Sequence, residues 1–403
     1  MIDQATGVDA RQPVASAVAT EVVYGTAAFL DLQPEWTSLF DRSRTQNPFL
    51  TWEWISTWVR HFCGESLRTV VVTDGQDVMA IAPFHLNRYL IGPGLHATAL
   101  QLLGPKEVQH LFEIREILVE PGRFEGAMGA ILDRVVTIPG WDWLEVSAVG
   151  EDVEALHGLL GRRDPPGFRL DVDPTTQIPI MALERTWGDQ RLRLKRNIKE
   201  SIRHCYNSLR RDGHTHSFDA DGAHGDAEAA GRRLVDLHRE RALITERRWH
   251  RDHFADRSIR DFEIDALRAM YAGQHARFAE LSVDGRLVAA RACLETNGSL
   301  YFYYSGFDPA WWKQSVMTLL IAEAIQDAIR RGLSNVNFST GMDESKSRWG
   351  PELVPMQSIS LVRQNPLALS RHRLLKLRKR VRQPLHRRLD RALSLAGRIR
   401  RPR

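Results

Sequence analysis

The last third of the chain changes from a strand-like alternation of apolar residues to helical spacing and back. Asp284-Gly285 and Asn297-Gly298 separate strand-like segments, and both pairs are typical of two-residue hairpin turns. Gly332 ends the helical segment. The strand-like segments are 276–283, 286–295, 300–306 and 335–340, and the helical segment is 315–331. The pattern predicts three antiparallel strands, a helix and a final parallel strand.

A similar order of elements occurs in the first part of the chain. A hairpin pair, Asp74-Gly75, again joins two strands, and a proline precedes a helix and a strand in both places, at Pro121 and at Pro309. The predicted strands are 21–30, 67–73, 78–86, 114–119 and 143–149, and the predicted helices are 34–44, 52–62 and 124–138. We interpret the recurrence as an internal duplication of one α/β unit. The alternative is an α/β chain that repeats such elements without duplication.

The segment between the two units is basic and has helical spacing. Residues 187–211 contain eight Lys or Arg and one apolar face. The face consists of Leu194, Ile198, Ile202, Tyr206 and Leu209. Further helices are predicted over 227–248 and 262–271. These helices form either a separate arm or the leading helices of the second unit.

Length and composition predict a two-domain α/β protein. The chain has 403 residues, of which 43% are hydrophobic, as expected for a globular protein with a substantial core. We expect a disordered lead, a first unit, a basic helical segment, a second unit with a mixed sheet, and a basic tail. Their predicted bounds are 1–20, 21–180, 181–275, 276–365 and 366–403. The 11 tryptophans are interpreted mainly as packing residues.

Several classes of protein are disfavoured by the sequence. The three cysteines are far apart and odd in number, which argues against a disulfide framework and a zinc site. His214 and His216 lie in a polar loop without a third ligand, so no metal is expected. The first 30 residues lack an apolar leader segment, and no run approaches the roughly 18 apolar residues of a membrane span. We therefore expect a cytoplasmic protein.

The basic charge is concentrated in the tail. Residues 371–403 contain 14 Lys or Arg and one acid, so residues 1–370 carry a net charge of −8 although the whole chain carries +5. Apolar residues recur in the tail at spacings of three and four: Leu374, Leu377, Val381, Leu385, Leu389 and Leu393. This basic amphipathic pattern favours an anionic membrane surface on the inner face of the membrane. The alternative is a disordered extension that binds any polyanion.

The junction of the third late strand and the following helix is a candidate site for a phosphorylated acyl carrier. Backbone N–H groups gather at such a helix start and suit a phosphate. Because no nucleophile elbow or Ser/His/Asp order is visible, direct attack of an acceptor on a thioester fits better than a covalent serine mechanism. The strand offers a backbone N–H to the thioester oxygen. Tyr303 and Tyr304 face opposite sides of a regular strand, and Tyr303 is assigned to the cleft.

Short segments in a fixed order along the chain resemble a known family. They are Asn47–Phe49, Trp52–Trp54 with Trp58, Ile81–Phe84, Arg191–Ile202, Leu237-His238 with Arg248-Trp249, Val283–Ala290, Ser305–Pro309 and Gly341–Trp349. Over about residues 35–362 the chain resembles the CelD-type acetyltransferases, a branch of the GNAT superfamily related to the FemABX peptidyltransferases. The resemblance implies tandem GNAT-like domains that transfer an acyl group from acyl-CoA, such as acetyl-CoA, to an amine or hydroxyl. It also implies a sugar, polysaccharide or lipid-linked envelope precursor as the acceptor.

The family's closing lysine maps onto Lys346. The chain departs from the family in the turn before the predicted helix 315–331. A glycine is usual in that turn, but here it reads Ser315-Val316-Met317, so Met317 brings a side chain to the expected phosphate site. Lys346 and Asp343 are expected to bind the acceptor or move protons, unless they are solvated loop charges.

The expected site therefore has three parts. The catalytic candidates are Lys346, Asp343 and Tyr303; the acyl-CoA candidates are Ser305, Gly306, Gln314, Ser315 and Thr318; the acceptor candidates are Arg248, Trp249 and Trp349. Arg248 and Trp249 either stack on a sugar or nucleotide ring or anchor the helical segment.

Two other functions stay open. One is a Fem-like transferase that uses aminoacyl-tRNA, which the basic helix and Met317 favour. The other is a non-catalytic GNAT-fold assembly factor at the membrane.

Overall fold

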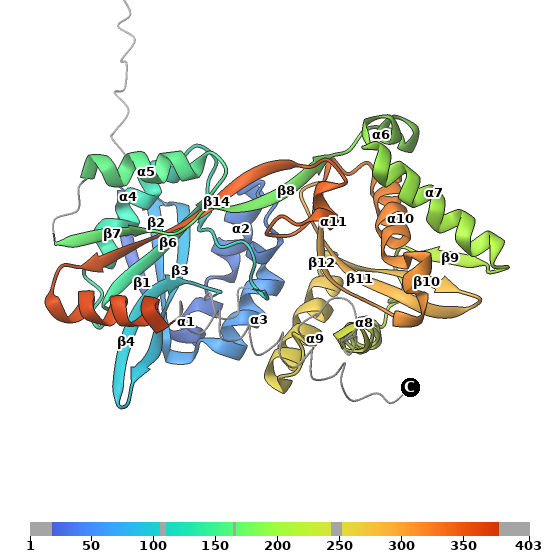
Figure 1. Cartoon of the computed structure of the whole chain (residues 1–403). Coiled ribbons are helices and arrows are strands. Elements are labelled where there is room, and N and C mark those ends of the chain that lie inside the picture. The colour runs from blue at the N-terminus through green and yellow to red at the C-terminus, as the bar shows by residue number, and fades with distance from the viewer. Residues whose placement is uncertain (1–17, 105–109, 164–166, 243–251, 379–403) are drawn as a thin grey trace, which may run out of the picture.

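The computed structural model describes residues 18–104, 110–163, 167–242 and 252–378. In these residues the chain is an α/β protein built around one mixed sheet of 14 strands, with helices on both faces (Figure 1). The strand order is β1-β2-β3-β4-β6-β14-β8-β13-β12-β11-β10-β9, with β5 beside β3 and β7 beside β14. The predicted fold class is confirmed. The order is nearly symmetric about its centre, so the sheet consists of two similar halves.

The N-terminal half contains β1 to β7. Its strands are β1 (Val18–Tyr24), β2 (Leu67–Asp74), β3 (Asp77–Gly92), β4 (Leu95–Leu102), β5 (Leu118–Val119), β6 (Trp143–Val149) and β7 (Phe168–Val172). Its helices are α1 (Gly25–Leu30), α2 (Gln33–Ser43), α3 (Trp52–Phe62), α4 (Phe124–Val135) and α5 (Asp152–Arg163). Thr51 caps α3 by accepting a hydrogen bond from the Trp54 N–H at 3.4 Å, which helps to fix where this helix begins.

The C-terminal half contains the remaining strands. They are β8 (Thr176–Ala182), β9 (His216–Asp219), β10 (Ala276–Val283), β11 (Arg286–Thr296), β12 (Ser299–Phe307), β13 (Asn335–Asn337) and β14 (Glu352–Arg363). The helices are α6 (Trp187–Arg193), α7 (Arg196–Arg211), α8 (Ala227–Ala242), α9 (Arg257–Ala272), α10 (Val316–Arg330) and α11 (Glu344–Ser347). The buried face of α7 packs with α10 in one core, so α6 and α7 are leading helices of this half rather than a separate arm.

The two halves exchange strands at the centre of the sheet (Figure 1). β8 follows the N-terminal half in sequence but pairs with β13 of the C-terminal half. β14 follows β13 in sequence but pairs with β6 of the N-terminal half over Met356–Val362. β8 and β14 also pair with each other, so the sheet is continuous. Because of this exchange, a boundary drawn along the chain does not separate the halves in space.

An aromatic core joins the halves. Trp36, Trp54 and Trp58 are buried, which confirms packing as the role of these tryptophans. Phe49, from the N-terminal half, contacts the rings of Tyr301 and Tyr303 in β12 at centroid distances of 5.3 and 5.8 Å. A single core that includes side chains from both halves fixes their relative position.

Several predicted elements differ from the structure. Residues 18–20 belong to β1 instead of the lead, and 25–30 form α1 instead of continuing the strand. The predicted strand 114–119 is reduced to β5, because most of that segment fills a gap in the sheet as described below. The predicted helix 187–211 is two helices, since Leu194 and Lys195 adopt extended backbone angles between them. The strands β4, β7, β8, β9 and β14 were not predicted, and β9 lies in a segment that was interpreted as a polar loop.

The start of the basic tail is a helix over 366–378 that packs on the N-terminal half. Leu375 is buried there against Ala97, Ala99 and Trp143. Arg371 pairs with Asp142 at 3.0 Å. Residues 366–378 were predicted to belong to the membrane-binding tail, but Leu375 and Arg371 of this helix pack against the N-terminal half. Leu374 and Leu377 of the predicted apolar series are exposed, and residues 379–403 lie outside the described residues.

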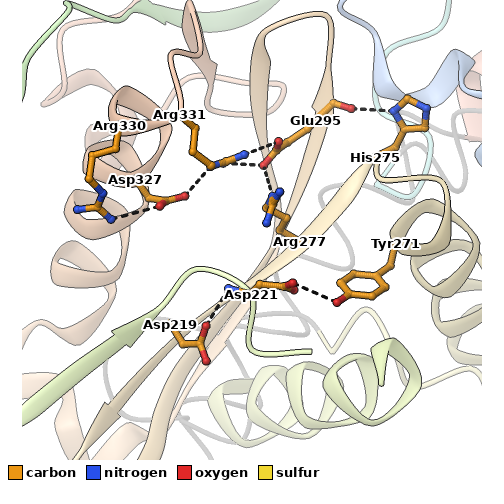
Figure 2. Close-up of polar contacts among 9 residues, drawn as sticks. All are labelled: Asp219, Asp221, Tyr271, His275, Arg277, Glu295, Asp327, Arg330 and Arg331. Carbon is orange, nitrogen blue, oxygen red and sulfur yellow. Dashed lines mark hydrogen bonds and ion pairs between the residues drawn. The ribbon is translucent and has the colours of Figure 1, made fainter. Parts of the chain in front are cut away.

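A polar cluster ties α10 to the sheet in the C-terminal half (Figure 2). The Glu295 carboxylate at the end of β11 accepts hydrogen bonds from both terminal nitrogens of Arg331, at 2.6 and 2.7 Å. Arg331 also donates to Asp327 at 2.7 Å, and Arg277 of β10 lies 3.3 Å from the same Glu295 carboxylate. The arginines of this cluster therefore have carboxylate partners.

Candidate functional site

The candidate site lies where β12 and β13 separate. The two parallel strands pair only from Ser299 with Asn335 to Tyr301 with Asn337, and β12 continues for six residues beyond that point. A cavity of about 410 Å³ lies beside the unpaired part of β12, the start of α10 and the turn before β14. Its lining is Arg241, Arg291, Ser305, Phe307, Trp311, Trp312, Ser315, Val316, Met317, Thr318, Ile321, Asp343, Ser345, Arg348 and Trp349. The volume is in the range of small-molecule sites.

The start of α10 forms one wall of the cavity. A 3₁₀ turn over Pro309–Gln314 precedes it, and Ser315 takes the left-handed conformation, with φ 54°, between the turn and the helix. The first N–H groups of an α-helix have no partners within the helix and carry its positive dipole end, so this wall suits an anion. Met317 lies in the lining and packs partly against the core. It narrows the cavity but does not fill it.

A β-bulge in β12 lies next to Arg291 and Ser305, which line the cavity. Arg291 pairs with Ser305 and Cys293 pairs with Phe302, so one residue between them in β11 faces two in β12, Tyr303 and Tyr304. The Arg291 side chain donates a hydrogen bond to the Tyr303 carbonyl at 3.1 Å. A bulge takes backbone groups out of the ladder. The bulge therefore offers main-chain groups that the regular sheet does not use.

The bulge also disrupts the alternation on which the assignment of Tyr303 to the cleft rested. The Tyr303 hydroxyl lies 2.8 Å from the Leu111 carbonyl and 3.3 Å from Glu263, in the core between the halves. Tyr304 likewise donates to the His110 carbonyl at 3.0 Å. The two rings contact each other at 4.6 Å rather than facing opposite sides. Tyr303 is thus outside the cavity.

The turn after β13 is organised by Lys346 and Asp343. The Lys346 ammonium donates to the carbonyls of Thr340 at 2.7 Å, Gly341 at 3.1 Å and Ser339 at 3.4 Å. Burial lowers the pKa of Lys346, while Glu113 and Asp343 oppose the shift. Asp343 lines the cavity and caps α11. Burial alone would raise the pKa of Asp343, but hydrogen bonds from Ser345 and Lys346 hold it below its usual value.

Glu113 is a partly buried carboxyl at this site that the sequence did not single out as functional. It comes from the N-terminal half, accepts a hydrogen bond from Ser339 at 2.5 Å and is bonded to the Tyr301 hydroxyl. Burial raises the pKa of Glu113, although these bonds and the Lys346 charge oppose the rise. An acid between Phe112 and Ile114, both buried, is the one local signal that could have indicated it.

The other predicted residues have varied surroundings. Ser305, Ser315, Thr318, Asp343 and Trp349 line the cavity together. Gly306 instead permits close packing, since a Cβ atom there would lie 2.3 Å from the backbone nitrogen of His238 in α8. Gln314 donates to Asp212 at 3.3 Å and is not in the lining. Arg248 and Trp249 lie outside the described residues.

The corresponding gap in the N-terminal half is closed. β4 and β6 are parallel and pair only from Ala99 with Trp143 to Gln101 with Glu145, as β12 and β13 do. The segment 110–117 enters the gap beyond them. Its Arg115, 3% exposed, lies 2.7 Å from Glu145 and donates to Ser358 of β14 at 3.0 Å. An ion pair therefore lies in this gap, and a cavity of about 360 Å³ remains beside it between residues 116–122, β6 and the start of α4.

Comparison with known proteins connects this geometry with a family. Residues 160–347 match the family model of the acetyltransferase (GNAT) domain. This match, from the end of α5 to α11, includes the strands and helix that form the cavity, and it supports a GNAT-type acyltransferase. The CelD branch is not specifically indicated. No curated protein sequence matches the chain.

Two solved structures share the fold over about four fifths of the chain. The crystal structure of FemX is 11% identical, with a TM-score of 0.57, covering 80% of this chain and 95% of that one. A conserved protein of unknown function from Bacteroides thetaiotaomicron VPI-5482 is 14% identical, with a TM-score of 0.50, covering 83% and 97%. At these identities the likeness concerns the fold alone.

Two further findings bear on the predicted absences. Within the part of the chain that the structure describes, no group of three or more His, Cys, Asp or Glu side chains is arranged to hold a metal ion. None of the described helices has both the length and the apolar character needed to cross a bilayer.

Proposed function

We propose that the protein is an N- or O-acyltransferase that binds acyl-CoA in the cavity between β12 and β13. The observation that carries the proposal is the separation of these strands beside the start of α10. A thioester arm fits along the unpaired part of β12, and the diphosphate lies against the first N–H groups of α10. The GNAT match over the same elements supports this assignment.

The reaction is a direct transfer. The nitrogen or oxygen of the acceptor attacks the thioester carbonyl carbon, the carbon–sulfur bond breaks, and the proton of the acceptor ends on the CoA thiolate. A backbone N–H at the bulge of β12 stabilises the oxyanion. Asp343, an ionised carboxylate in the lining, orients the acceptor.

Lys346 is assigned a positioning role. An ammonium group has three donors, and Lys346 has three carbonyls within hydrogen-bond distance. It therefore holds the turn that contains Asp343. Because all three of its N–H groups have carbonyl partners, we do not assign it the role of general acid. The exposed rim residue Trp312 and the half-buried Trp311 make the mouth of the cavity suitable for a ring such as adenine.

The acceptor that we propose is a sugar, polysaccharide or lipid-linked envelope precursor. The basic tail supports it, because Leu374 and Leu377 are exposed on the helix 366–378 beside Arg373 and Arg378. An amphipathic basic surface suits the headgroups of an anionic membrane, where a lipid-linked precursor is found.

Isothermal titration calorimetry with CoA and acetyl-CoA tests the proposal. We expect binding to the wild type and its loss in Ser305→Phe, which places a ring inside the cavity. Ser217→Phe, on the edge strand β9 where Ser217 is exposed, is the matched control and retains binding. If the wild type binds neither compound while it remains folded, the proposal fails.

A Fem-like transferase that takes an aminoacyl group from tRNA is the second candidate. The fold shared with FemX and the basic helix α7, whose Arg196 is almost fully exposed, favour it. Filter binding of charged tRNA separates the two functions. Retention of charged tRNA together with no binding of CoA would reverse our preference.

A further inference from the structure

The cavity contains a partly buried cation without a carboxylate partner, and this feature bears on the acyl group that the proposed acyltransferase transfers. Arg291 of β11 lines the cavity and forms no ion pair with any described carboxylate. Its Nε atom is buried and has no hydrogen-bond partner, and its guanidinium lies over the Phe302 ring at 4.9 Å. Arg115, Arg277 and Arg331 all have Glu partners within 3.3 Å.

The surroundings of Arg291 contain more cations than ionised acids. Arg241 and Arg348 line the same cavity, and the Lys346 ammonium is close enough to affect Arg291 electrostatically. The nearby acids are Asp343 and Glu113, and burial favours the neutral form of Glu113. Desolvation lowers the pKa of Arg291 to about 10, so the arginine remains charged at neutral pH. Burying such a charge costs free energy unless an anion accompanies it.

The position of Arg291 indicates which part of the ligand would supply that anion. The arginine donates to the Tyr303 carbonyl in the bulge of β12, where the proposed function places the thioester. The diphosphate of the donor is assigned to the start of α10, so Arg291 is left facing the acyl end. An acetyl group is neutral and therefore gives the guanidinium no negative charge to pair with.

We propose that the acyl group of the donor ends in a carboxylate, as in a malonyl or succinyl thioester, and that Arg291 binds this carboxylate. This inference rests on the proposed acyl-CoA function. In the transfer, the acceptor attacks the thioester carbonyl carbon, the carbon–sulfur bond breaks and the acceptor proton passes to the thiolate. The terminal carboxylate keeps its charge and its contact with Arg291 throughout. A planar guanidinium pairs with a carboxylate through two parallel hydrogen bonds, which a neutral chain cannot make.

The test compares CoA, acetyl-CoA, malonyl-CoA and succinyl-CoA by isothermal titration calorimetry with the full chain. We expect malonyl- or succinyl-CoA to bind at least about ten-fold more tightly than acetyl-CoA, because a charge-assisted hydrogen bond is made only with the carboxylate. Equal binding of acetyl-CoA and both carboxylated donors would overturn the inference and leave the proposed function standing. Failure of all four to bind would reject the proposed function itself.

A variant locates the preference. Arg291→Gln removes the charge and keeps a donor for the Tyr303 carbonyl, so we expect the preference for a carboxylated donor over acetyl-CoA to disappear. Arg277→Gln, in the polar cluster of Figure 2 and outside the cavity, is the control and keeps the preference. An equal loss of affinity for all four compounds in Arg291→Gln would show that Arg291 binds the part of CoA that they share, and would overturn the inference. Because the wild-type comparison needs no variant, misfolding of Arg291→Gln leaves the test decisive.

Discussion

Each half of the sheet contains a pair of parallel strands that separate, but different groups lie beyond the two points of separation. In the N-terminal half the segment 110–117 enters the gap and Arg115 pairs there with Glu145. In the C-terminal half the gap between β12 and β13 contains a cavity. The two halves therefore place different groups at corresponding positions, a buried ion pair in one and an arginine-lined cavity in the other. The segment that closes the first gap also brings Glu113 to the second.

Breaking the closed half gives the largest expected effect. Arg115→Ala removes one partner of a buried ion pair, so we expect the free energy of unfolding to fall by about 3–5 kcal/mol in urea denaturation. Arg163→Ala, in a more exposed pair with Asp133, is the control and costs less than about 1 kcal/mol. The paired change Arg115→Met with Glu145→Leu restores most of the loss. Equal effects of Arg115→Ala and Arg163→Ala would contradict a structural role for the filled gap.

The next largest effect on stability is expected in the C-terminal half, where α8 packs closely on β12 at Gly306. Gly306→Ala places a Cβ atom 2.3 Å from the His238 backbone nitrogen, so α8 must move, and we expect a loss of about 1–3 kcal/mol in thermal unfolding. Gly126→Ala in α4 meets no atom within 4 Å and replaces a helical glycine, so it is neutral or stabilising by up to about 1 kcal/mol. A Gly306→Ala protein with unchanged stability would show that this contact is not tight.

The acid beside Tyr303 predicts a pH dependence for the core between the halves. Burial raises the pKa of Glu263 from 4.5 to about 8, so the folded protein keeps this proton where the unfolded chain has lost it. Since the folded state then binds more protons, stability falls as the pH rises from about 4.5 to 8, by about 1.4 kcal/mol per unit at most. Relative to the wild type, Glu263→Gln should therefore gain stability over this range in urea denaturation at several pH values. The exposed Glu35→Gln is the control, and a parallel profile for Glu263→Gln would refute the prediction.

The smallest effect on stability is expected from the end of the chain. A protein that ends at residue 378 keeps the contacts of Leu375 and Arg371, so its unfolding free energy should change by less than about 0.5 kcal/mol. Its binding to vesicles with anionic lipids should decrease, as measured by sedimentation, because it has lost most of the basic residues of the tail. A protein that ends at residue 365 is the comparison and should be clearly destabilised. Unchanged sedimentation after removal of 379–403 would reject the membrane role of those residues.

The sequence predicted elements whose patterns are local. The bounds of α3 were predicted correctly, since Trp54, Trp58 and the capping Thr51 are all within a few residues of each other. β6 was also correct, as seven consecutive residues, 143–149, form a strand. β14 was missed because Ser358 and Ser360 are buried polar residues inside it and weaken its apolar pattern. Its partner β6 is also about 200 residues away in sequence, a relation that no local pattern contains.

The same distinction applies to the candidate site. The neighbouring strand end and helix start contain Ser305, Ser315 and Thr318, and their adjacency in sequence allowed all three to be predicted together. Arg291 and Glu113 were missed, because an arginine in a strand or a glutamate in a loop is ordinarily exposed. Their burial results from contacts between distant segments. Tyr303 was misplaced for a different reason, since a β-bulge changes the direction of side chains without a clear sequence signal.

The exchange of β8 and β14 has a consequence for synthesis on the ribosome. β6 is complete once residue 149 has been made, but its neighbour in the sheet ends at Arg363, more than 200 residues later. Throughout that interval the nascent chain presents an unpaired strand edge, which is a template for association with other chains. That edge is covered only once residues 352–363 have been made and β14 has paired with β6.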